Sequence, residues 1–155
     1  MTQDLKALYG AEAEAQRARY AALNTAFAEA FGAAEALEYF SAPGRTEVGG
    51  NHTDHQHGHV LCGSVDLDML ACAAPNGTDL VRIQSEGYPA LEVDLRDLKV
   101  REEEKNSSPA LVRGVAARLA ELGCRPAGFD AYVTSTVLSG SGLSSSAAYE
   151  ILVAT

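Results

Sequence analysis

Hydrophobic residues at helical spacing mark the start of the chain. The segment is rich in Ala, Glu, Gln and Arg, and its larger apolar residues recur mostly at steps of three or four, as on one face of a helix. They are Leu5, Leu8, Tyr20, Leu23, Phe27 and Phe31. Because glycine tolerates the left-handed conformation of helix ends, Gly10 is a point at which the helix divides and Gly32 a point at which it stops. The pattern predicts helix over residues 3–30.

Several later segments have the composition or the period of β-strands. They are residues 36–42, 60–74, 80–84, 91–95 and 128–138. The first leads into Pro43 and Gly44. Asn76-Gly77 is a hairpin turn signal, so the second and third segments are predicted to pair as antiparallel strands. The fourth alternates apolar and acidic side chains, as a strand with one face in water does.

A second helix is predicted between the fourth and fifth of these segments. The charged residues 101–105 are most simply a solvated loop or helix edge, after which Ser108 is an N-cap and Pro109 the first helical residue. Gly123 stands where a glycine commonly ends a helix. The apolar face of this helix consists of Leu111, Val112, Val115, Ala116, Leu119 and Leu122.

Composition and charge indicate a single soluble domain covering residues 1–155. The chain is 46% hydrophobic, enough for one core, and its formal net charge is -9. A chain this acidic lacks the basic surface that nucleic acids and anionic membranes require, so we expect neither as a partner. No segment has the length of a membrane span, and the N-terminus lacks the pattern of a signal peptide.

The cysteines indicate a reducing compartment. Cys62, Cys72 and Cys124 are odd in number, widely spaced and set in apolar surroundings. That usage is typical of buried thiols and not of a disulfide framework. We therefore expect a cytoplasmic location.

The most informative segment is the glycine-rich loop that follows the last predicted strand, with sequence LSGSGLSSSAA at residues 138–148. Gly140 and Gly142 allow close approach of a ligand, and the serines and alanines after them open a helix whose first amide groups face an anion. This suits a triphosphate, and a serine hydroxyl can join the coordination shell of Mg²⁺. The alternative is a flexible Gly/Ser connection ending in a serine N-cap, since short glycine motifs are common.

Two motifs together resemble those of one kinase family. The sequence GSGLSSSAA at residues 140–148 resembles the phosphate-binding motif of the GHMP kinases, and within them that of galactokinases. The sequence PGRTEVGGNHTDHQHGHVL at residues 43–61 resembles the galactokinase signature, and LVRGV at residues 111–115 resembles the galactokinase helix before the phosphate strand. The resemblance covers nearly the whole chain from Phe40 onward. It implies the α+β fold of the GHMP kinase N-terminal domain, which is like ribosomal protein S5 domain 2.

The resemblance also implies roles for individual residues. Arg45 matches the arginine that stabilises the transferring phosphoryl group, the alternative being a surface salt bridge. His52 and Asp54 match residues that hydrogen-bond sugar hydroxyls, and the backbone from Asn51 through Thr53 would line the same pocket. Residues that would bind ATP are Ser85, Gly140, Ser141, Gly142, Leu143, Ser144, Ser145 and Ser146, of which Ser146 would also bind Mg²⁺.

Departures from the family pattern bear on substrate and activity. Asn51 stands where galactokinases usually have glutamate, and Glu47 where they commonly have asparagine, so the hexose is galactose or a related sugar. Family members are longer, and their catalytic aspartate lies beyond Thr155. The chain is therefore interpreted as the N-terminal part of an enzyme that phosphorylates the anomeric hydroxyl of galactose with ATP, inactive by itself. Dimerisation of such a truncated domain is an additional expectation if it exposes an apolar face.

Two alternative functions stay open at this point. His52, His55, His57 and His59 are dense enough to hold Zn²⁺ or another transition metal, although their match to a sugar-pocket loop favours separate roles. The second alternative is a regulator of the same family that binds sugar and ATP without catalysis. The residue that would separate enzyme from regulator is not in this sequence.

Overall fold

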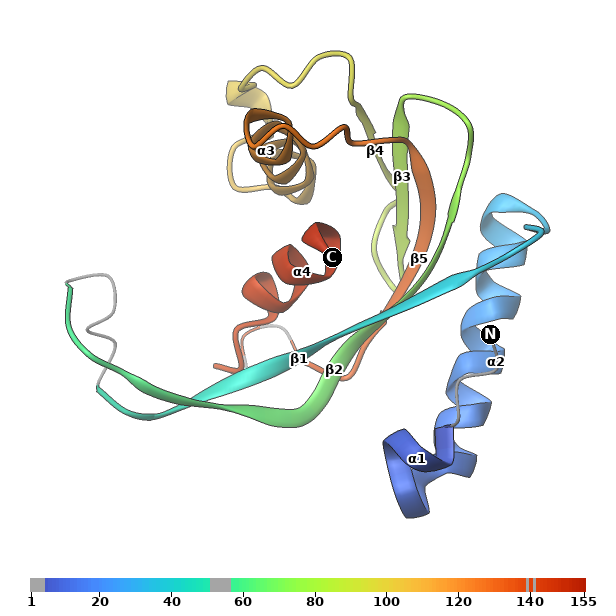
Figure 1. The fold of residues 1–155 in the computed structure, drawn as a ribbon, viewed down its shortest axis with the longest axis vertical. Helices are drawn as coiled ribbons and strands as arrows, with labels where there is room; N and C mark the ends of the chain where they lie inside the picture. Colours follow the sequence, from blue (N-terminus) through green and yellow to red (C-terminus); the bar gives the residue numbers. More distant parts are fainter. Residues whose placement is uncertain (1–4, 51–56, 139, 141) are drawn as a thin grey trace.

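The computed structural model describes residues 5–50, 57–138, 140 and 142–155. These residues form helices on both faces of one five-stranded sheet (Figure 1). In chain order the elements are α1 (Leu5–Tyr9), η1 (Gly10–Glu12), α2 (Ala13–Phe31), β1 (Glu38–Gly49), β2 (Leu61–Pro75), β3 (Leu80–Ser85), β4 (Leu91–Asp94), η3 (Glu102–Glu104), α3 (Ser108–Glu121), β5 (Phe129–Ser135) and α4 (Ser145–Ala154). None of the helices within the described ranges is both long and apolar enough to cross a membrane.

The prediction for the N-terminal helix is confirmed where the structure describes it. Gly10 opens a short 3-10 turn that separates α1 from α2, and α2 stops at Gly32, whose φ is 90°. The buried part of its apolar face is Leu23 and Phe27, each 2% exposed, whereas Leu8 is 62% exposed. Only the second half of the predicted helical stripe therefore packs against the sheet.

The order of strands in the sheet is β1-β2-β5-β3-β4, and this corrects the predicted hairpin. β2 and β3 do not pair, because β5 lies between them, antiparallel to β2 and parallel to β3. The residues at the Asn76-Gly77 turn instead form hydrogen bonds with Gly128, which directly precedes β5. Asn76 N donates to Gly128 O at 3.4 Å, and Gly128 N donates to Thr78 O at 3.1 Å.

Gly128 makes this insertion possible. A Cβ atom at this position would lie 2.6 Å from Leu80 O and 2.8 Å from Leu80 N, and closer still to Thr78 O. Real Cβ atoms do not approach backbone atoms so closely, and backbone atoms held in a ladder cannot give way. Only glycine therefore lets the chain enter between β2 and β3.

Strand β1 is longer than predicted, since it continues through Pro43 and Gly44 to Gly49. Proline is tolerated here because β1 is an edge strand and its ladder with β2 shifts register between Pro43 and Arg45. The outer parts of β1 and β2 form a two-stranded ribbon that extends away from the body of the molecule (Figure 1). Two large apolar side chains on this ribbon are exposed, Val48 at 68% and Leu61 at 65%.

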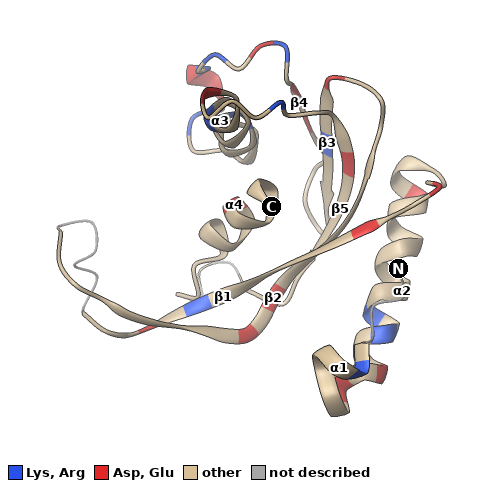
Figure 2. Ribbon diagram, in the orientation of Figure 1, with Lys and Arg blue, Asp and Glu red and all other residues tan. Residues whose placement is uncertain are grey.

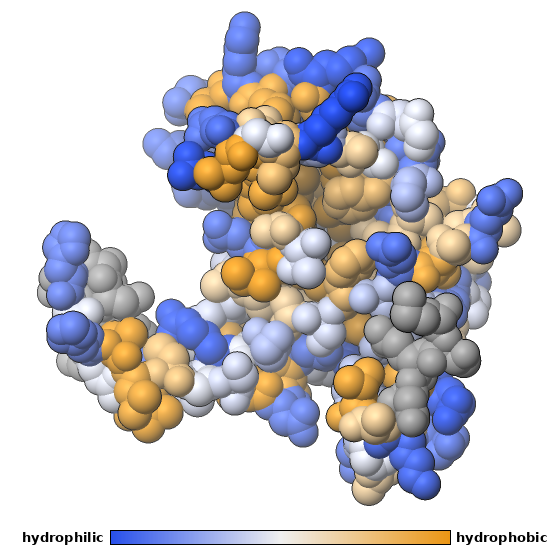
Figure 3. Space-filling model, in the orientation of Figure 1, coloured by the Kyte–Doolittle hydropathy of each residue, from blue (hydrophilic) through white to orange (hydrophobic). Residues whose placement is uncertain are grey.

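The two faces of the sheet have separate hydrophobic cores. Alternate residues of β2 point to opposite faces, so Leu70, Cys72 and Ala74 pack with Leu23 and Phe27 of α2. The other core joins the opposite face to α3 and α4 and consists of Ala42, Met69, Ala71, Val81, Ile83, Val93, Val112, Ala131, Val133, Ala148 and Leu152. An apolar hollow of about 340 Å³ remains between α3, α4 and the sheet, and Figure 3 shows it as a recess of hydrophobic side chains.

The connection from β4 to α3 differs from its prediction. Ser107, not Ser108, is the N-cap residue of α3, and Leu122 of the predicted apolar face is 63% exposed. Gly123 follows the helix with φ of 86°, as predicted. Acidic and basic residues alternate along this connection (Figure 2), but they are not simply solvated. Glu104 is paired with Arg113 of α3, whose side chain is only 4% exposed.

The prediction of three buried thiols is wrong for two of them. All three cysteines are free, and Cys72 is buried, but Cys62 and Cys124 are exposed. Burial raises the pKa of the Cys72 thiol to about 11, so this side chain behaves as a small hydrophobic residue. Apolar neighbours in the sequence did not predict the burial of these two cysteines correctly, because Cys62 lies on the extended ribbon and Cys124 follows the end of α3.

Candidate functional site

The glycine-rich loop ends in a helix whose first turn has no side-chain cap. Gly140, Gly142 and Ser144 have φ of 75°, 77° and 59°, so three residues just before α4 adopt the left-handed backbone conformation. Ser144 is the N-cap residue of α4, and its side chain makes no capping hydrogen bond. The amide groups at the start of α4 thus remain available to a ligand, and the helix dipole there favours an anion.

The two sequence motifs meet at this loop. The amide of Arg45 on β1 donates a hydrogen bond of 3.1 Å to the carbonyl oxygen of Leu143. The preceding residue, Gly44, is buried against the same segment, where a Cβ atom would lie 3.1 Å from Leu143 O and 3.2 Å from both methyl groups of Val137. The absence of a side chain at Gly44 therefore allows β1 to touch the loop, and the main chain of Arg45 is fixed beside it.

The guanidinium group of Arg45 lies along the ribbon. Its Nη1 atom is 3.5 Å from Sγ of Cys62 on β2, and the side chain is partly exposed. No carboxylate of the described residues forms a salt bridge with it, so the surface ion pair considered from the sequence is not formed within that part of the chain. A partly exposed arginine whose main chain adjoins the glycine-rich loop is chemically suited to contact a phosphate.

Asp68 ties the loop to the rest of the fold. Its carboxylate accepts hydrogen bonds of 2.5 Å from Arg19 of α2 and from Ser41 of β1. Its main chain is joined to Thr136, which lies between β5 and the loop, through Thr136 N to Asp68 O at 2.9 Å and Asp68 N to Thr136 Oγ1 at 3.0 Å. α2, both ribbon strands and the start of the loop are thereby held together at one point.

A groove of about 920 Å³ runs from α4 to the start of α3. Ser145 and Ser146 of α4 border it, and Ser85 lies at the end of β3. The other lining residues come from the segments 86–91 and 106–111, from Tyr149 of α4, and from Met69, Val133, Ser135 and Val137. The structure therefore brings Ser85 together with two serines of the glycine-rich loop, although they are far apart in the sequence. The volume lies within the range of pockets that enclose small ligands.

The lining of this groove combines apolar side chains with several hydroxyl groups and is not basic. Among its described residues there is no lysine or arginine, and Figure 2 shows no basic residue on α4. The one charged residue, Glu86, accepts a hydrogen bond of 2.7 Å from Thr134 Oγ1. A phosphate in the groove would have to be met by amide groups, serine hydroxyls and a metal ion.

The remaining predicted residues are placed as follows. Asn51, His52, Thr53, Asp54 and Ser141 lie outside the described residues. In the sequence, the first four stand between β1 and β2, and Ser141 stands between Gly140 and Gly142. His52 and His55 of the proposed metal cluster are also outside, and among the described residues no group of three or more His, Cys, Asp or Glu is arranged to hold a metal ion.

The analysis of sequence missed several groove residues. Tyr88, Asn106 and Tyr149 line it beside the predicted serines. Asn106 has φ of 61°, a conformation that asparagine adopts more readily than most residues, but an asparagine before serines carries no motif of its own. Tyr149 lies in a helix among apolar residues, where its pattern is that of an ordinary core residue.

Comparison with known proteins finds relatives for most of the chain. A family model described as the galactokinase galactose-binding signature matches residues 25–75. The galactokinase of Lactococcus lactis subsp. cremoris (strain MG1363) is 35% identical over 136 residues, which are 85% of this chain and 34% of that protein. The galactokinase of Bacillus subtilis (strain 168) is 34% identical over 131 residues, 82% of this chain and 33% of that protein. The chain thus spans about a third of the length of the curated relatives it matches.

Solved structures agree with this result. The crystal structure of Lactococcus lactis galactokinase complexed with galactose matches with a TM-score of 0.79 and 32% identity, covering 87% of this chain and 35% of that one. Methanococcus jannaschii mevalonate kinase matches with a TM-score of 0.62 over 79% of this chain and 39% of that one, at 17% identity, and shares the fold alone. The GHMP kinase fold expected from the sequence is confirmed.

Proposed function

Because this chain belongs to the galactokinase family within the GHMP kinases, we propose that it is the sugar- and ATP-phosphate-binding part of a kinase acting on galactose. The observation that carries the proposal is the hydrogen bond from Arg45 N to Leu143 O. It holds β1, which lies within the galactose-binding signature, against the loop whose amide groups suit a triphosphate. A sugar and the phosphoryl group it accepts have to meet at such a junction.

In the proposed reaction, the oxygen of the anomeric hydroxyl attacks the γ-phosphorus of ATP. A bond from that oxygen to phosphorus forms, the bond from phosphorus to the bridging oxygen breaks, and ADP leaves while the hydroxyl proton goes to a base. The family resemblance assigns this base to an aspartate outside the present sequence. Asn51, His52, Thr53 and Asp54 would bind the sugar hydroxyls. Because an amide at Asn51 donates as well as accepts, the hexose is galactose or a close relative.

The nucleotide would occupy the groove between α4 and α3. The first amide groups of α4 and the residues Gly140, Ser141, Gly142, Leu143, Ser144 and Ser145 would surround its phosphates, and Ser85 would contact it from the end of β3. Arg45 would stabilise charge on the phosphoryl group during transfer. Three free cysteines within the described ranges agree with a cytoplasmic location for this chemistry.

The residues present fit a magnesium ion. Mg²⁺ prefers oxygen ligands and keeps several water molecules, so a single protein hydroxyl beside phosphate oxygens is a reasonable donor set. The exposed Ser146 hydroxyl on the first turn of α4 borders the groove and would be that donor. When bound, the ion neutralises phosphate charge.

Replacing Ser146 with alanine is expected to weaken the binding of Mg²⁺-ATP to this chain about tenfold, or about 1.4 kcal/mol, and to leave galactose binding unchanged. The variant loses a metal ligand but keeps the helix. Asp54→Ala should do the reverse, weakening galactose and not Mg²⁺-ATP. Isothermal titration calorimetry with each ligand measures both. If either variant lost affinity for galactose and for Mg²⁺-ATP to the same extent, the proposal of separate subsites would be contradicted.

Replacing Arg45 with alanine is expected to weaken Mg²⁺-ATP about tenfold and AMP much less, because the guanidinium is assigned to the terminal phosphoryl group. Arg118→Ala is the matched control, since Arg118 is 68% exposed and pairs with Glu121 on the far part of α3. It removes the same charge without touching the groove. If both variants lost ATP affinity alike, net charge and not a contact with phosphate would explain the effect.

A further inference from the structure

Tyr149 lies one turn after the serines that border the groove. It follows Ser145 by four positions and Ser146 by three, so all three share one face of α4. Side chains of a helix lean toward its N-terminus, which directs this ring back over the first turn. Tyr149 lines the groove together with Ser85 of β3. A phenol therefore lies at the meeting point of two segments assigned to the nucleotide.

The Tyr149 hydroxyl is buried without a well-formed hydrogen bond among the described residues. Its neighbour is the Ser85 hydroxyl, which is close enough to lower the phenol pKa in opposition to the stronger effect of burial. Burial nevertheless raises the pKa of Tyr149 to about 12. The phenol is therefore protonated at neutral pH and can donate a hydrogen bond.

A structural role for this hydroxyl is a poor explanation. Phenylalanine or leucine would fill the same apolar space without the free-energy cost of a buried polar atom that lacks a partner. Packing explains the ring, since Tyr149 borders the core formed by α4, α3 and the sheet. It does not explain the oxygen, which has Ser85, another residue of the groove, as a polar neighbour.

Resting on the nucleotide site proposed above, we propose that Tyr149 is a positioning residue that orients Ser85 for the nucleotide. A small rotation of either side chain lets the phenol donate its proton to Ser85 Oγ. A serine hydroxyl has one proton to donate and two acceptor sites, so once it accepts from Tyr149 its own proton is free to turn into the groove. Ser85 then donates to an oxygen of the bound nucleotide, and the chain of two hydrogen bonds strengthens both.

The test is a double-mutant cycle on the binding of Mg²⁺-ATP to this chain by calorimetry. Tyr149→Phe keeps the ring and removes the oxygen, and Ser85→Ala removes the group it orients. We expect each variant to bind Mg²⁺-ATP about fivefold more weakly, and the double variant to bind no more weakly than Ser85→Ala alone. Galactose affinity should stay close to that of the unmodified chain, and the thermal midpoint should not fall in either variant.

The matched control is Tyr132→Phe, which removes a phenol oxygen from the residue that packs against the α2 core on the other face of the sheet. It should leave ATP affinity unchanged. The positioning role would be overturned by unaltered ATP affinity in Tyr149→Phe. It would also be overturned if the loss of ATP affinity in the double variant equalled the product of the two single losses. Either result would leave the proposed nucleotide site unaffected. Failure of the unmodified chain to bind Mg²⁺-ATP would overturn the nucleotide site itself, and with it this inference.

Discussion

Replacing Gly128 with alanine is expected to lower the free energy of unfolding by about 4 kcal/mol, a large part of the stability of a domain of this size. The added methyl group would lie 2.6 Å from Leu80 O and 2.8 Å from Leu80 N, and these backbone atoms belong to the ladder of β3. Relief requires β5 to move away from β3. Urea denaturation followed by circular dichroism measures the change.

Gly114→Ala is the matched control for this experiment. Gly114 lies within α3, and a Cβ atom there meets nothing within 4 Å. The same substitution at this position should stabilise the chain by about 0.5–1 kcal/mol, because alanine loses less backbone entropy in a helix than glycine does. If Gly128→Ala unfolded at the urea concentration of the unmodified chain, the passage of β5 between β2 and β3 would not depend on glycine.

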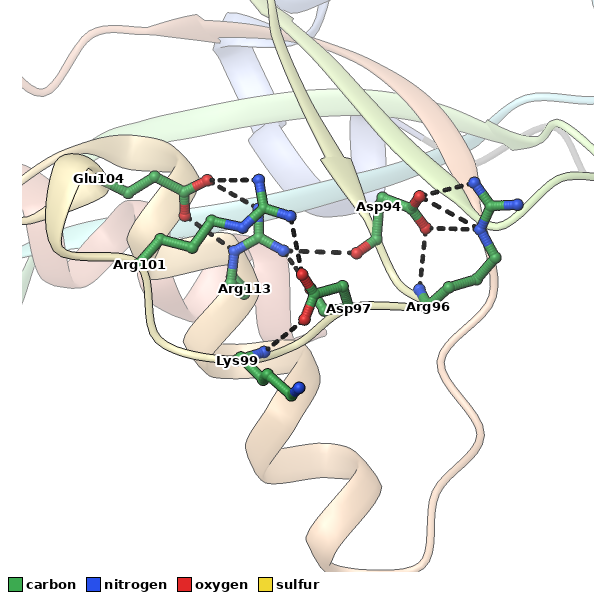
Figure 4. Close-up of polar contacts among 7 residues, drawn as sticks. All are labelled: Asp94, Arg96, Asp97, Lys99, Arg101, Glu104 and Arg113. Atoms are coloured by element: carbon green, nitrogen blue, oxygen red, sulfur yellow. Dashed lines mark hydrogen bonds and ion pairs between the residues drawn. The ribbon is translucent and has the colours of Figure 1, made fainter.

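The second large effect is expected at Arg113, which holds the connection between β4 and α3 (Figure 4). Its guanidinium donates to both carboxylate oxygens of Glu104 at 2.7 and 2.8 Å, and to the main-chain oxygens of Asp94 and Asp97. Arg113 and Glu104 are 4% and 15% exposed. Removal of the Arg113 cation leaves a largely enclosed carboxylate with only the more distant Arg101, at 3.7 Å, and takes a donor from two carbonyl groups. We expect Arg113→Met to cost about 3 kcal/mol of unfolding free energy.

Arg118→Met is the control for Arg113, since it removes an arginine from the same helix. Arg118 and its partner Glu121 are 68% and 66% exposed, and such pairs contribute little. We expect its midpoint of urea denaturation to equal that of the unmodified chain. A similar destabilisation by both substitutions would show that the loss of any arginine from α3 is responsible, and not the loss of the enclosed ion pair.

The same ion pair predicts a pH dependence. Hydrogen bonds from Arg113 lower the pKa of Glu104 below its usual value, and Arg96 lowers that of Asp94 to about 2. A carboxyl group whose pKa is lower in the folded chain stabilises the fold at neutral pH, and this contribution is lost as the pH falls through the folded pKa. The unmodified chain should therefore lose stability below pH about 4 more steeply than Arg113→Met. Urea denaturation of both proteins at pH 7 and pH 3 measures this loss. An equal loss of unfolding free energy in the unmodified chain and in Arg113→Met would contradict the prediction.

Local features of the fold followed from the sequence. The division of the first helix at Gly10 and its end at Gly32 depend on backbone conformations that glycine adopts easily, and the structure has both. The helix after the glycine-rich loop begins at Ser145, within the predicted segment. Such features involve neighbours within a few residues, so a pattern of adjacent positions contains the information.

Contacts between segments distant in the sequence could not be predicted from the sequence. The Asn76-Gly77 signal correctly marks a turn, yet the strand that pairs with β2 arrives from residues 129–135. The charged residues 101–105 were expected in solvent, but Glu104 is enclosed by a partner on α3. In both cases the decisive contact comes from a segment distant in the sequence, and hydrophobic periodicity does not specify which segment that is.

For the candidate site too, some features could be predicted from the sequence and others depend on the tertiary structure. The sequence by itself indicated which residues are chemically suited to a sugar and a triphosphate, since Arg45, Asp54 and Ser146 stand in motifs that resemble those of the galactokinases. Only the tertiary structure decided that Arg45 touches Leu143, that Ser85 shares a groove with Ser146, and that Tyr149 lies beside Ser85. The physical reason is that a motif specifies functional groups and local backbone geometry, whereas their convergence depends on the strand order, which is set by packing across the whole sheet.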